Sequence, residues 1–214
     1  AVTLPRAGNI GGGGFMLVHL AAENRNVFID YREMAPAAAT RDMFLTPEGK
    51  VDKRLAYFSH KASGVPGTVA GLIHALEQYG TLPLETVIQP AIDLAANGFT
   101  MDITLHQNLS ARAERLAQDP ETKRIFLREG GEAPAIGSLF KQPDLAGTLQ
   151  RIADKGLEGF YAGKTAELIA SDMAANDGLI TQEDLASYVA VERTPATGQF
   201  RGYDIVSALP PSSG

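Results

Sequence analysis

Two stretches near the start of the chain alternate apolar and polar side chains, a pattern typical of β-strands. They are FMLVHLAA, residues 15–22, and VFIDYR, residues 27–32. The polar ENRN between them is a turn signal, so we expect the two strands to pair as an antiparallel hairpin. Near the other end, FRGYDIVSALPP, residues 200–211, predicts one more strand.

The middle of the chain carries apolar residues at helical spacing. Residues 63–80 are the clearest case, because four apolar side chains share one face of the expected helix: Val69, Leu72, Ile73 and Leu76. Pro66 suits the first turn of this helix, and Gly80 ends it. Further helices are expected over residues 84–98, 103–117, 119–130, 143–156 and 163–178. A hairpin, a helical middle and a final strand favour the α+β class.

Weaker signals predict local structure between these elements. The alanine run after Pro36 predicts a short helix that ends near Phe44, and the polar residues 46–57 predict an exposed loop. Thr181 and Asp184 form a capping-box pattern that opens a short helical turn.

The glycine-rich stretch GNIGGGGF, residues 8–15, invites comparison with phosphate-binding loops. A dinucleotide fingerprint beginning at Gly11 would need its third glycine at Met16, and a P-loop would need Lys where Phe15 follows Gly14. A strand follows rather than a helix, so no helix N-terminus is available to bind phosphate. The remaining explanation is a close approach of two backbone segments, where a Cβ atom would not fit.

Length and composition narrow the function classes. With 214 residues, 44% of them hydrophobic, the chain can form one globular domain with a substantial core. The net charge of −6 provides no basic surface for nucleic acid, and no apolar run approaches the roughly 18 residues that span a membrane. The absence of cysteine excludes disulfides and thiolate metal sites. Both ends look cut, so we expect a piece of a longer polypeptide.

The chain offers few candidates for catalysis or metal binding. The four histidines are scattered and more typical of structural or exposed positions than of metal ligands: His19, His60, His74 and His106. There is no G-x-S-x-G motif, and SHKASG, residues 59–64, is interpreted as a helix-entry loop rather than part of a catalytic triad.

Arg32 is the one residue with a clear binding chemistry. It ends the second expected strand, within DYREMAP, between Asp30 and Glu33. A fixed guanidinium can hold a carboxylate through two parallel hydrogen bonds. The alternative is a salt bridge to Asp30 or Glu33, and the residues alone leave both possibilities open.

Several stretches of the chain closely resemble the large subunit of bacterial γ-glutamyltranspeptidases. They are GNIGGGGF, DYREMAPAAATRDMF, SGVPGTVAG, QPAIDLAANGF, GLITQEDLASY and VERTPATGQFRGYDIVSALPPSSG. They cover essentially the whole chain in the family order, and the R-E-M-A-P and P-P-S-S-G stretches make the resemblance specific. Related amidohydrolases, including cephalosporin acylases and a capsule-anchoring transpeptidase, share the scaffold and are the alternative.

The resemblance implies the N-terminal nucleophile hydrolase fold, a four-layer αββα sandwich. Residues 1–214 would then be a single incomplete domain, part of the large subunit of a precursor that cleaves itself. A threonine at the new N-terminus of the small subunit attacks the γ-glutamyl amide of glutathione or a relative. The γ-glutamyl group passes to water or to amino-acid or peptide acceptors, without an organic cofactor or catalytic metal.

The resemblance also assigns roles to this chain. Arg32 would bind the α-carboxylate of the substrate, while the nucleophile and the oxyanion donors lie on the small subunit. Ser212 and Ser213 match a large-subunit segment and not the nucleophile, so the chain alone would not catalyse. The resemblance to this family also implies a periplasmic or secreted location. The competing hypothesis is a non-catalytic module that binds glutamate on the same scaffold.

Overall fold

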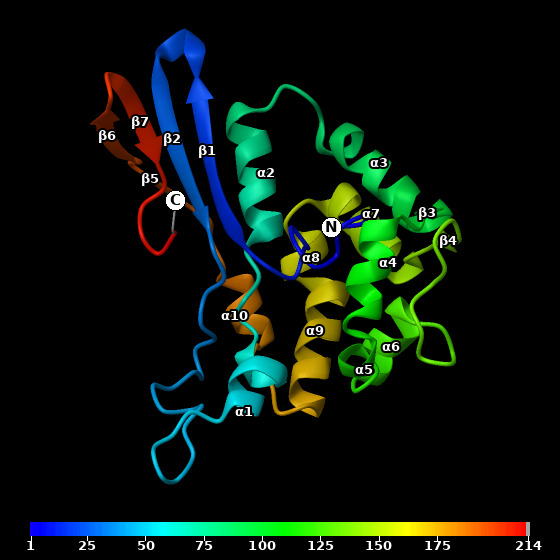
Figure 1. Ribbon diagram of the computed structural model, residues 1–214. Coiled ribbons are helices and arrows are strands. Elements are labelled where there is room, and N and C mark those ends of the chain that lie inside the picture. The colour runs from blue at the N-terminus through cyan, green and yellow to red at the C-terminus, as the bar shows by residue number, and fades with distance from the viewer. Residues whose placement is uncertain (213–214) are drawn as a thin grey trace. The chain divides into compact units, whose positions relative to one another are not determined.

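The computed structural model of the chain describes residues 1–212 (Figure 1). The chain divides into two compact units, each built from two stretches of sequence. The first unit contains Ala1–Ala7 and Pro83–Asp154, and the second contains Gly8–Leu82 and Lys155–Gly214. The expectation of a single incomplete domain stays a prediction.

A three-stranded antiparallel sheet forms the frame of the second unit within the described residues. β1 (Gly14–Leu20) pairs with β2 (Arg25–Tyr31) so that Gly14 lies opposite Tyr31. β5 (Val191–Arg193) pairs with the other edge of β2. The expected hairpin is therefore confirmed, whereas β5 was not predicted.

β2 is the central strand, and consecutive rather than alternate side chains in it are buried: Val27, Phe28 and Ile29. Both faces of the strand are therefore covered, and α2 (Thr68–Tyr79) lies against it (Figure 1). A short 3₁₀ turn, η1 (Ala21–Glu23), joins β1 to β2.

α2 is the strongest helix expected from the sequence, and its inward face is mostly as predicted. Val69 and Ile73 are buried, but Leu72 is 49% exposed. The expected position of Pro66 in the first turn is wrong, because the helix begins at Thr68.

The start of α2 is capped from the glycine-rich stretch. The N–H groups of Gly67 and Thr68 donate to the carbonyl oxygen of Gly12 at 2.8 and 3.0 Å. Because the first N–H groups of a helix otherwise lack partners, this carbonyl satisfies donors that a phosphate would need. The glycine-rich stretch itself leads into β1, as the sequence predicted, and not into a helix.

The helices α8 (Glu158–Tyr161), α9 (Gly163–Ala175) and α10 (Gln182–Ala186) complete the packed part of the second unit. α9 was expected, and α8 was not. The capping box is confirmed, since the Thr181 side chain accepts from the Asp184 N–H and the Asp184 side chain accepts from the Thr181 N–H.

Two stacked tyrosines tie these helices to the start of α2. The rings of Tyr161 and Tyr188 lie 5.7 Å apart and nearly parallel. The Tyr161 hydroxyl donates to the carbonyl oxygen of Pro66 at 2.8 Å and accepts from the Ala70 N–H at 3.2 Å. Both backbone groups are buried at this point, so the hydroxyl satisfies polar atoms that water does not reach.

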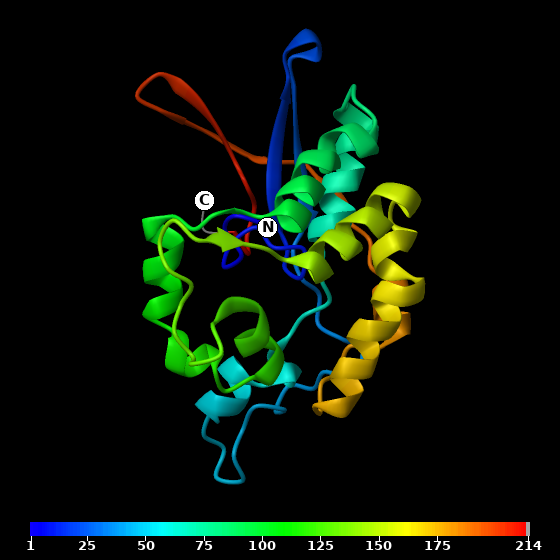
Figure 2. The ribbon, with the colours of Figure 1, turned by 90° about the vertical axis from the view of Figure 1, so that its right-hand side faces the viewer.

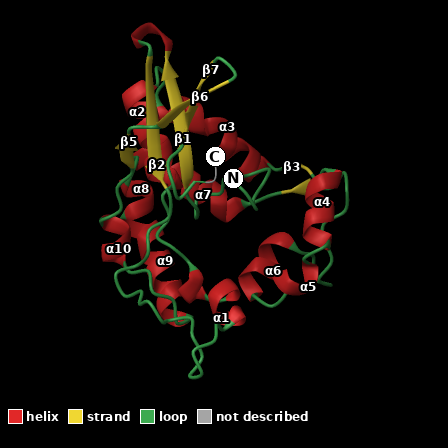
Figure 3. Ribbon diagram, turned by 60° about the vertical axis from the view of Figure 1, so that its left-hand side comes forward, coloured by secondary structure: helices red, strands yellow, loops and turns green. Residues whose placement is uncertain are grey.

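The loop between β2 and α1 (Lys53–Phe58) contains no helix, so the short helix expected to end near Phe44 is wrong (Figure 3). Ala37 and Ala38 are exposed there and bury no apolar face. Alanine propensity alone does not repay the cost of nucleating so short a helix.

The prediction of an exposed loop over residues 46–57 is wrong from residue 53 onward. α1 begins at Lys53, after Asp52, whose side chain accepts from the Leu55 N–H at 3.0 Å. An aspartate at that position is an N-cap signal that the sequence already carried. A 3₁₀ turn, η2 (His60–Ala62), follows α1.

The single strand expected over residues 200–211 is instead part of a hairpin. β6 (Ala196–Phe200) pairs with β7 (Tyr203–Ser207). Arg201 and Gly202 form the turn, both with positive φ. Figure 2 shows this orange-to-red hairpin standing apart from the blue β1–β2 hairpin.

The first unit is mainly helical, as expected. Its elements are α3 (Leu84–Asn97), β3 (Phe99–Thr100), α4 (Ile103–Ser110), α5 (Ala113–Leu116), α6 (Pro120–Phe126), β4 (Leu139–Phe140) and α7 (Pro143–Lys155). One cluster of buried side chains in this unit contains Met101, Leu105, Leu109, Ala133 and Phe140. The single helix expected over residues 103–117 is broken at Arg112, whose φ of −124° and ψ of 6° are not helical.

The α+β class is confirmed, since both helices and antiparallel sheets are present. Among residues 1–212, no helix has the length and apolar character that crossing a membrane requires.

Close backbone contact explains the glycine-rich stretch. A Cβ atom on Gly13 would lie 2.5 Å from the carbonyl oxygen of Tyr31 and 2.6 Å from the backbone nitrogen of Glu33. Neither atom can move without shifting the chain around Arg32. The sequence-based explanation of this stretch is therefore confirmed.

We expect Gly13→Ala to lower the free energy of unfolding by about 1–3 kcal/mol, because the added methyl group would push against backbone atoms. Gly11→Ala is the matched control, since its Cβ would meet nothing closer than the Asn9 side-chain oxygen at 3.5 Å. Urea denaturation of both variants measures the difference. Equal stability of the two variants would contradict this packing argument.

We expect Tyr161→Phe to cost about 1–3 kcal/mol of unfolding free energy near neutral pH, because two buried backbone groups lose their partner. Burial raises the pKa of Tyr161 above the ordinary 10, so its stabilisation is complete below pH 10 and is lost as pH rises further. The difference between wild type and variant should therefore shrink above about pH 10. Tyr57→Phe, at a 71% exposed position, is the control in the same denaturation series. A difference that stayed constant with pH would refute the linkage.

Candidate functional site

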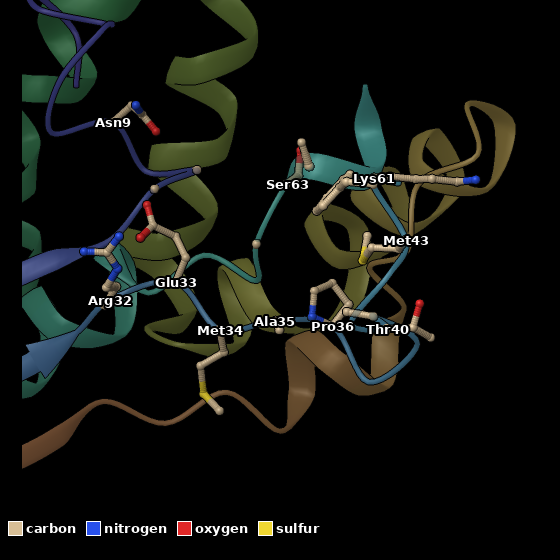
Figure 4. A pocket seen from close by; sticks show the side chains of 16 residues that line it. Asn9, Arg32, Glu33, Met34, Ala35, Pro36, Thr40, Met43, Lys61 and Ser63 are labelled. Atoms are coloured by element: carbon tan, nitrogen blue, oxygen red, sulfur yellow. The ribbon is translucent and has the colours of Figure 1, made fainter. Parts of the chain in front are cut away.

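Arg32 follows directly after β2 and lines a pocket of about 740 Å³ in the second unit. The pocket lies between the glycine-rich stretch, residues 32–44 and residues 61–64. Figure 4 shows the side chains of Arg32 and Glu33 directed to the same side, toward Asn9, while Lys61 points away from them. The pocket therefore presents a cation and an acid next to each other at one end.

Within residues 1–212, no ion pair joins the Arg32 guanidinium to Asp30 or Glu33. The guanidinium lies over the ring of Phe15, whose centroid is 5.9 Å from the guanidinium carbon. An aromatic face supports a cation without neutralising it. The alternative of a salt bridge to either neighbouring acid is thus not found in this part of the chain.

Asp30 uses its carboxylate for another purpose. One oxygen accepts from the backbone N–H of Arg32 at 3.1 Å, and the other accepts from the Arg193 guanidinium at 2.9 Å. The Asp30 side chain is only 13% exposed. This carboxylate therefore links the end of β2 to β5 and leaves the guanidinium of Arg32 available.

The carbonyl oxygen of Arg32 accepts a hydrogen bond from the Tyr188 hydroxyl at 2.8 Å. Burial, together with the nearby charges of Asp30 and Glu33, raises the pKa of Tyr188 to about 12. The hydroxyl is therefore protonated, and able to donate, throughout the neutral and mildly alkaline range.

Further contacts hold the segment that follows Arg32. The N–H of Ala37 donates to Asp184 at 2.8 Å, and Met34 exchanges two backbone hydrogen bonds with Val65. Burial tends to raise the pKa of Asp184, but hydrogen bonds from Ala37 and Thr181 outweigh it and lower this pKa. Asp184 is therefore ionised at neutral pH as it caps α10 and holds the loop.

The other residues considered in the sequence do not gather into a site. Each histidine contacts a different partner: His19 with Asn26, His60 with Asp172, His74 with Glu192 and His106 with the Pro134 carbonyl. In the described part of the chain, no group of three or more acids or histidines is placed to hold a metal ion.

The segment SHKASG adopts the η2 turn ahead of α2, in agreement with a helix-entry loop. Ser212 lies in a turn, where its N–H donates to the carbonyl oxygen of Leu209 at 3.1 Å. Ser213 lies outside the described residues.

Sequence reasoning identified Arg32 but missed the residues that hold its backbone, namely Asp30, Tyr188 and Asp184. Two of them, Asp184 and Tyr188, lie in GLITQEDLASY, where the sequence indicated only a capping box and the family resemblance. Their contacts span about 150 residues of sequence, so no local pattern reveals them.

Comparison with known proteins places this arrangement in a family. The family model for gamma-glutamyltranspeptidase matches residues 1–214. The glutathione hydrolase proenzyme of Escherichia coli K12 is 51% identical over 215 residues, which cover 100% of this chain and 37% of that protein. An acylase ACY 1 proenzyme of Pseudomonas sp. strain V22 is 39% identical, over 99% of this chain and 39% of that one.

Solved structures agree. The crystal structure of Helicobacter pylori gamma-glutamyltranspeptidase matches with a TM-score of 0.97 and 47% identity, over 100% of this chain and 61% of that chain. The N-terminal nucleophile hydrolase fold implied by the resemblance is thereby confirmed for the portion that this chain represents. The chain spans little more than a third of the length of the curated relatives that it matches. From its sequence and its fold, this chain belongs to the gamma-glutamyltranspeptidase family.

Proposed function

We propose that this chain is the large-subunit portion of a γ-glutamyltransferase that also hydrolyses glutathione. In this function, Arg32 binds the α-carboxylate of the γ-glutamyl substrate. The observation that carries the proposal is the Arg32 guanidinium in the pocket, without an ion pair in residues 1–212 although acids lie at positions 30 and 33. A cation kept free in this way suits a carboxylate supplied by a ligand.

The chemistry is that of a threonine nucleophile on a separate small subunit. Its hydroxyl oxygen attacks the γ-carbonyl carbon of the donor, its own α-amine takes the proton, and the amide C–N bond breaks. The amine leaves with that proton, and a γ-glutamyl ester remains on the threonine. Water, or the amino group of an amino acid or peptide, then attacks the ester and releases the product. This chain contributes the scaffold and Arg32.

Exposed apolar side chains in the second unit support a partner subunit. Phe200, Tyr203 and Ile205 of the β6–β7 hairpin are 62%, 74% and 45% exposed. Val191, which begins β5, and Val189, two residues before it, are also exposed. Exposed apolar patches of this kind mark protein contacts. We propose that the small subunit covers them, since the relatives are proenzymes nearly three times as long as this chain. The proposed location, periplasmic or secreted, rests on the family resemblance.

Two other functions use the same scaffold. A non-catalytic module would bind glutamate through Arg32 without a small subunit, and an acylase would prefer other acyl groups. The support for an acylase is weaker than the support for a glutathione hydrolase, because the acylase relative is 39% identical to this chain and the glutathione hydrolase is 51% identical. Arg32-dependent glutamate binding to the isolated chain would favour the module. Faster cleavage of a simple aliphatic acyl anilide than of a γ-glutamyl anilide would favour the acylase.

In the processed two-subunit protein, we expect Arg32→Ala to raise the KM for a γ-glutamyl anilide by about 10- to 100-fold, because a charged hydrogen-bonded pair is lost. Arg32→Lys should recover only part of this loss, since an ammonium lacks the planar fork that matches a carboxylate. Steady-state kinetics measure both effects.

The control is Lys61→Ala, which removes a pocket-lining cation that points away from Arg32. Its KM should stay within about twofold of wild type, because Lys61 is half-buried and its side chain is directed away from the guanidinium proposed to bind the substrate. An unchanged KM in Arg32→Ala would overturn the assignment of Arg32 to the α-carboxylate.

A further inference from the structure

The backbone of Arg32 is held on both sides of its Cα atom. The N–H on one side donates to Asp30 at 3.1 Å, and the carbonyl oxygen on the other accepts from Tyr188 at 2.8 Å. Arg32 itself lies beyond the end of β2 and is exposed, so no ladder hydrogen bond fixes it. These two contacts therefore restrict the backbone angles that set the direction of its side chain.

Tyr188 is itself rigidly placed. It is 8% exposed, and its ring stacks on that of Tyr161, which in turn bonds Pro66 and Ala70 at the start of α2. Because the ring is held in place, the position of the Tyr188 hydroxyl relative to the carbonyl oxygen of Arg32 is also fixed. The hydroxyl keeps its ability to donate over a wide pH range, because burial and the neighbouring acids hold its pKa near 12.

The same short stretch holds the loop at a second point. Asp184, four residues before Tyr188, accepts from the N–H of Ala37 at 2.8 Å. The segment from Arg32 to Ala37 is thus anchored at both ends by residues 184–188. The hydrogen bonds from Tyr188 and to Asp184 order this loop before a ligand binds. The loop therefore loses less conformational entropy when a ligand binds.

We propose that Tyr188 is a positioning residue, whose hydroxyl fixes the backbone of Arg32 so that the guanidinium is oriented for a ligand carboxylate before the ligand arrives. This inference rests on the proposed function, because it assumes that Arg32 binds the α-carboxylate. Tyr188 touches no substrate in this role. It acts through the carbonyl oxygen of Arg32.

The test is Tyr188→Phe in the processed two-subunit enzyme, which removes the hydroxyl and keeps the stacked ring. We expect the KM for a γ-glutamyl anilide to rise about three- to tenfold, the worth of one hydrogen bond, with kcat within about twofold of wild type. Inhibition by L-glutamate should weaken by the same factor. Inhibition by γ-aminobutyrate, which lacks the α-carboxylate, should not change.

Two further variants separate positioning from general damage. Tyr161→Phe removes a hydroxyl that bonds Pro66 and Ala70 but keeps the ring on which Tyr188 stacks, so we expect a lower Tm with an unchanged KM. In an Arg32→Ala background, Tyr188→Phe should have no further effect on KM, because the group that it positions is gone.

The outcomes are distinguishable. An unchanged KM in Tyr188→Phe, an additive effect in the Arg32→Ala background, or equal weakening of both inhibitors would overturn the positioning role. If Arg32→Ala itself leaves KM unchanged, the proposed function of Arg32 fails instead. A Tm loss in Tyr188→Phe as large as in Tyr161→Phe, with the glutamate inhibition unaltered, would reduce Tyr188 to a structural residue.

Discussion

The second unit depends on the close contact between the glycine-rich stretch and the end of β2. Gly13 approaches the backbone of Tyr31 and Glu33 so closely that no Cβ atom fits. From the same stretch, the carbonyl oxygen of Gly12 caps the start of α2. One segment without side chains therefore joins the sheet to the helix beside it. Arg32 lies between the two backbone atoms against which Gly13 packs, so this contact also sets where the pocket can form.

The hydrogen bonds of the acid nearest before Arg32 in the chain determine whether the Arg32 guanidinium is available to a ligand. Asp30, two residues before Arg32, is engaged by the Arg193 guanidinium and by the backbone N–H of Arg32. An arginine whose neighbouring carboxylate is already occupied retains its capacity for an external anion. Among residues 1–212, neither Asp30 nor Glu33 forms a salt bridge with Arg32, which supports the proposed ligand-binding role.

Local signals predicted much of the fold and one residue of the candidate site. The β1–β2 hairpin, the end of α2 at Gly80 and the capping box of α10 all follow from neighbouring residues, and all are present. The failures lie where local propensity is weak. The alanine run after Pro36 had no apolar face to bury. The residues of β6, which precede the turn at Arg201, carry no clear alternation of apolar and polar side chains.

The sequence by itself determined that Arg32 is a candidate for carboxylate binding, that the glycines serve backbone contact, and that the chain resembles one family. Only the tertiary structure decided which groups hold Arg32. Asp184 and Tyr188 lie about 150 residues further along the chain and reach the loop through single hydrogen bonds. Such contacts depend on how the chain folds back on itself, and no periodic or local pattern encodes them. The physical reason is that a hydrogen bond requires an approach of about 3 Å in space and sets no limit on separation in sequence.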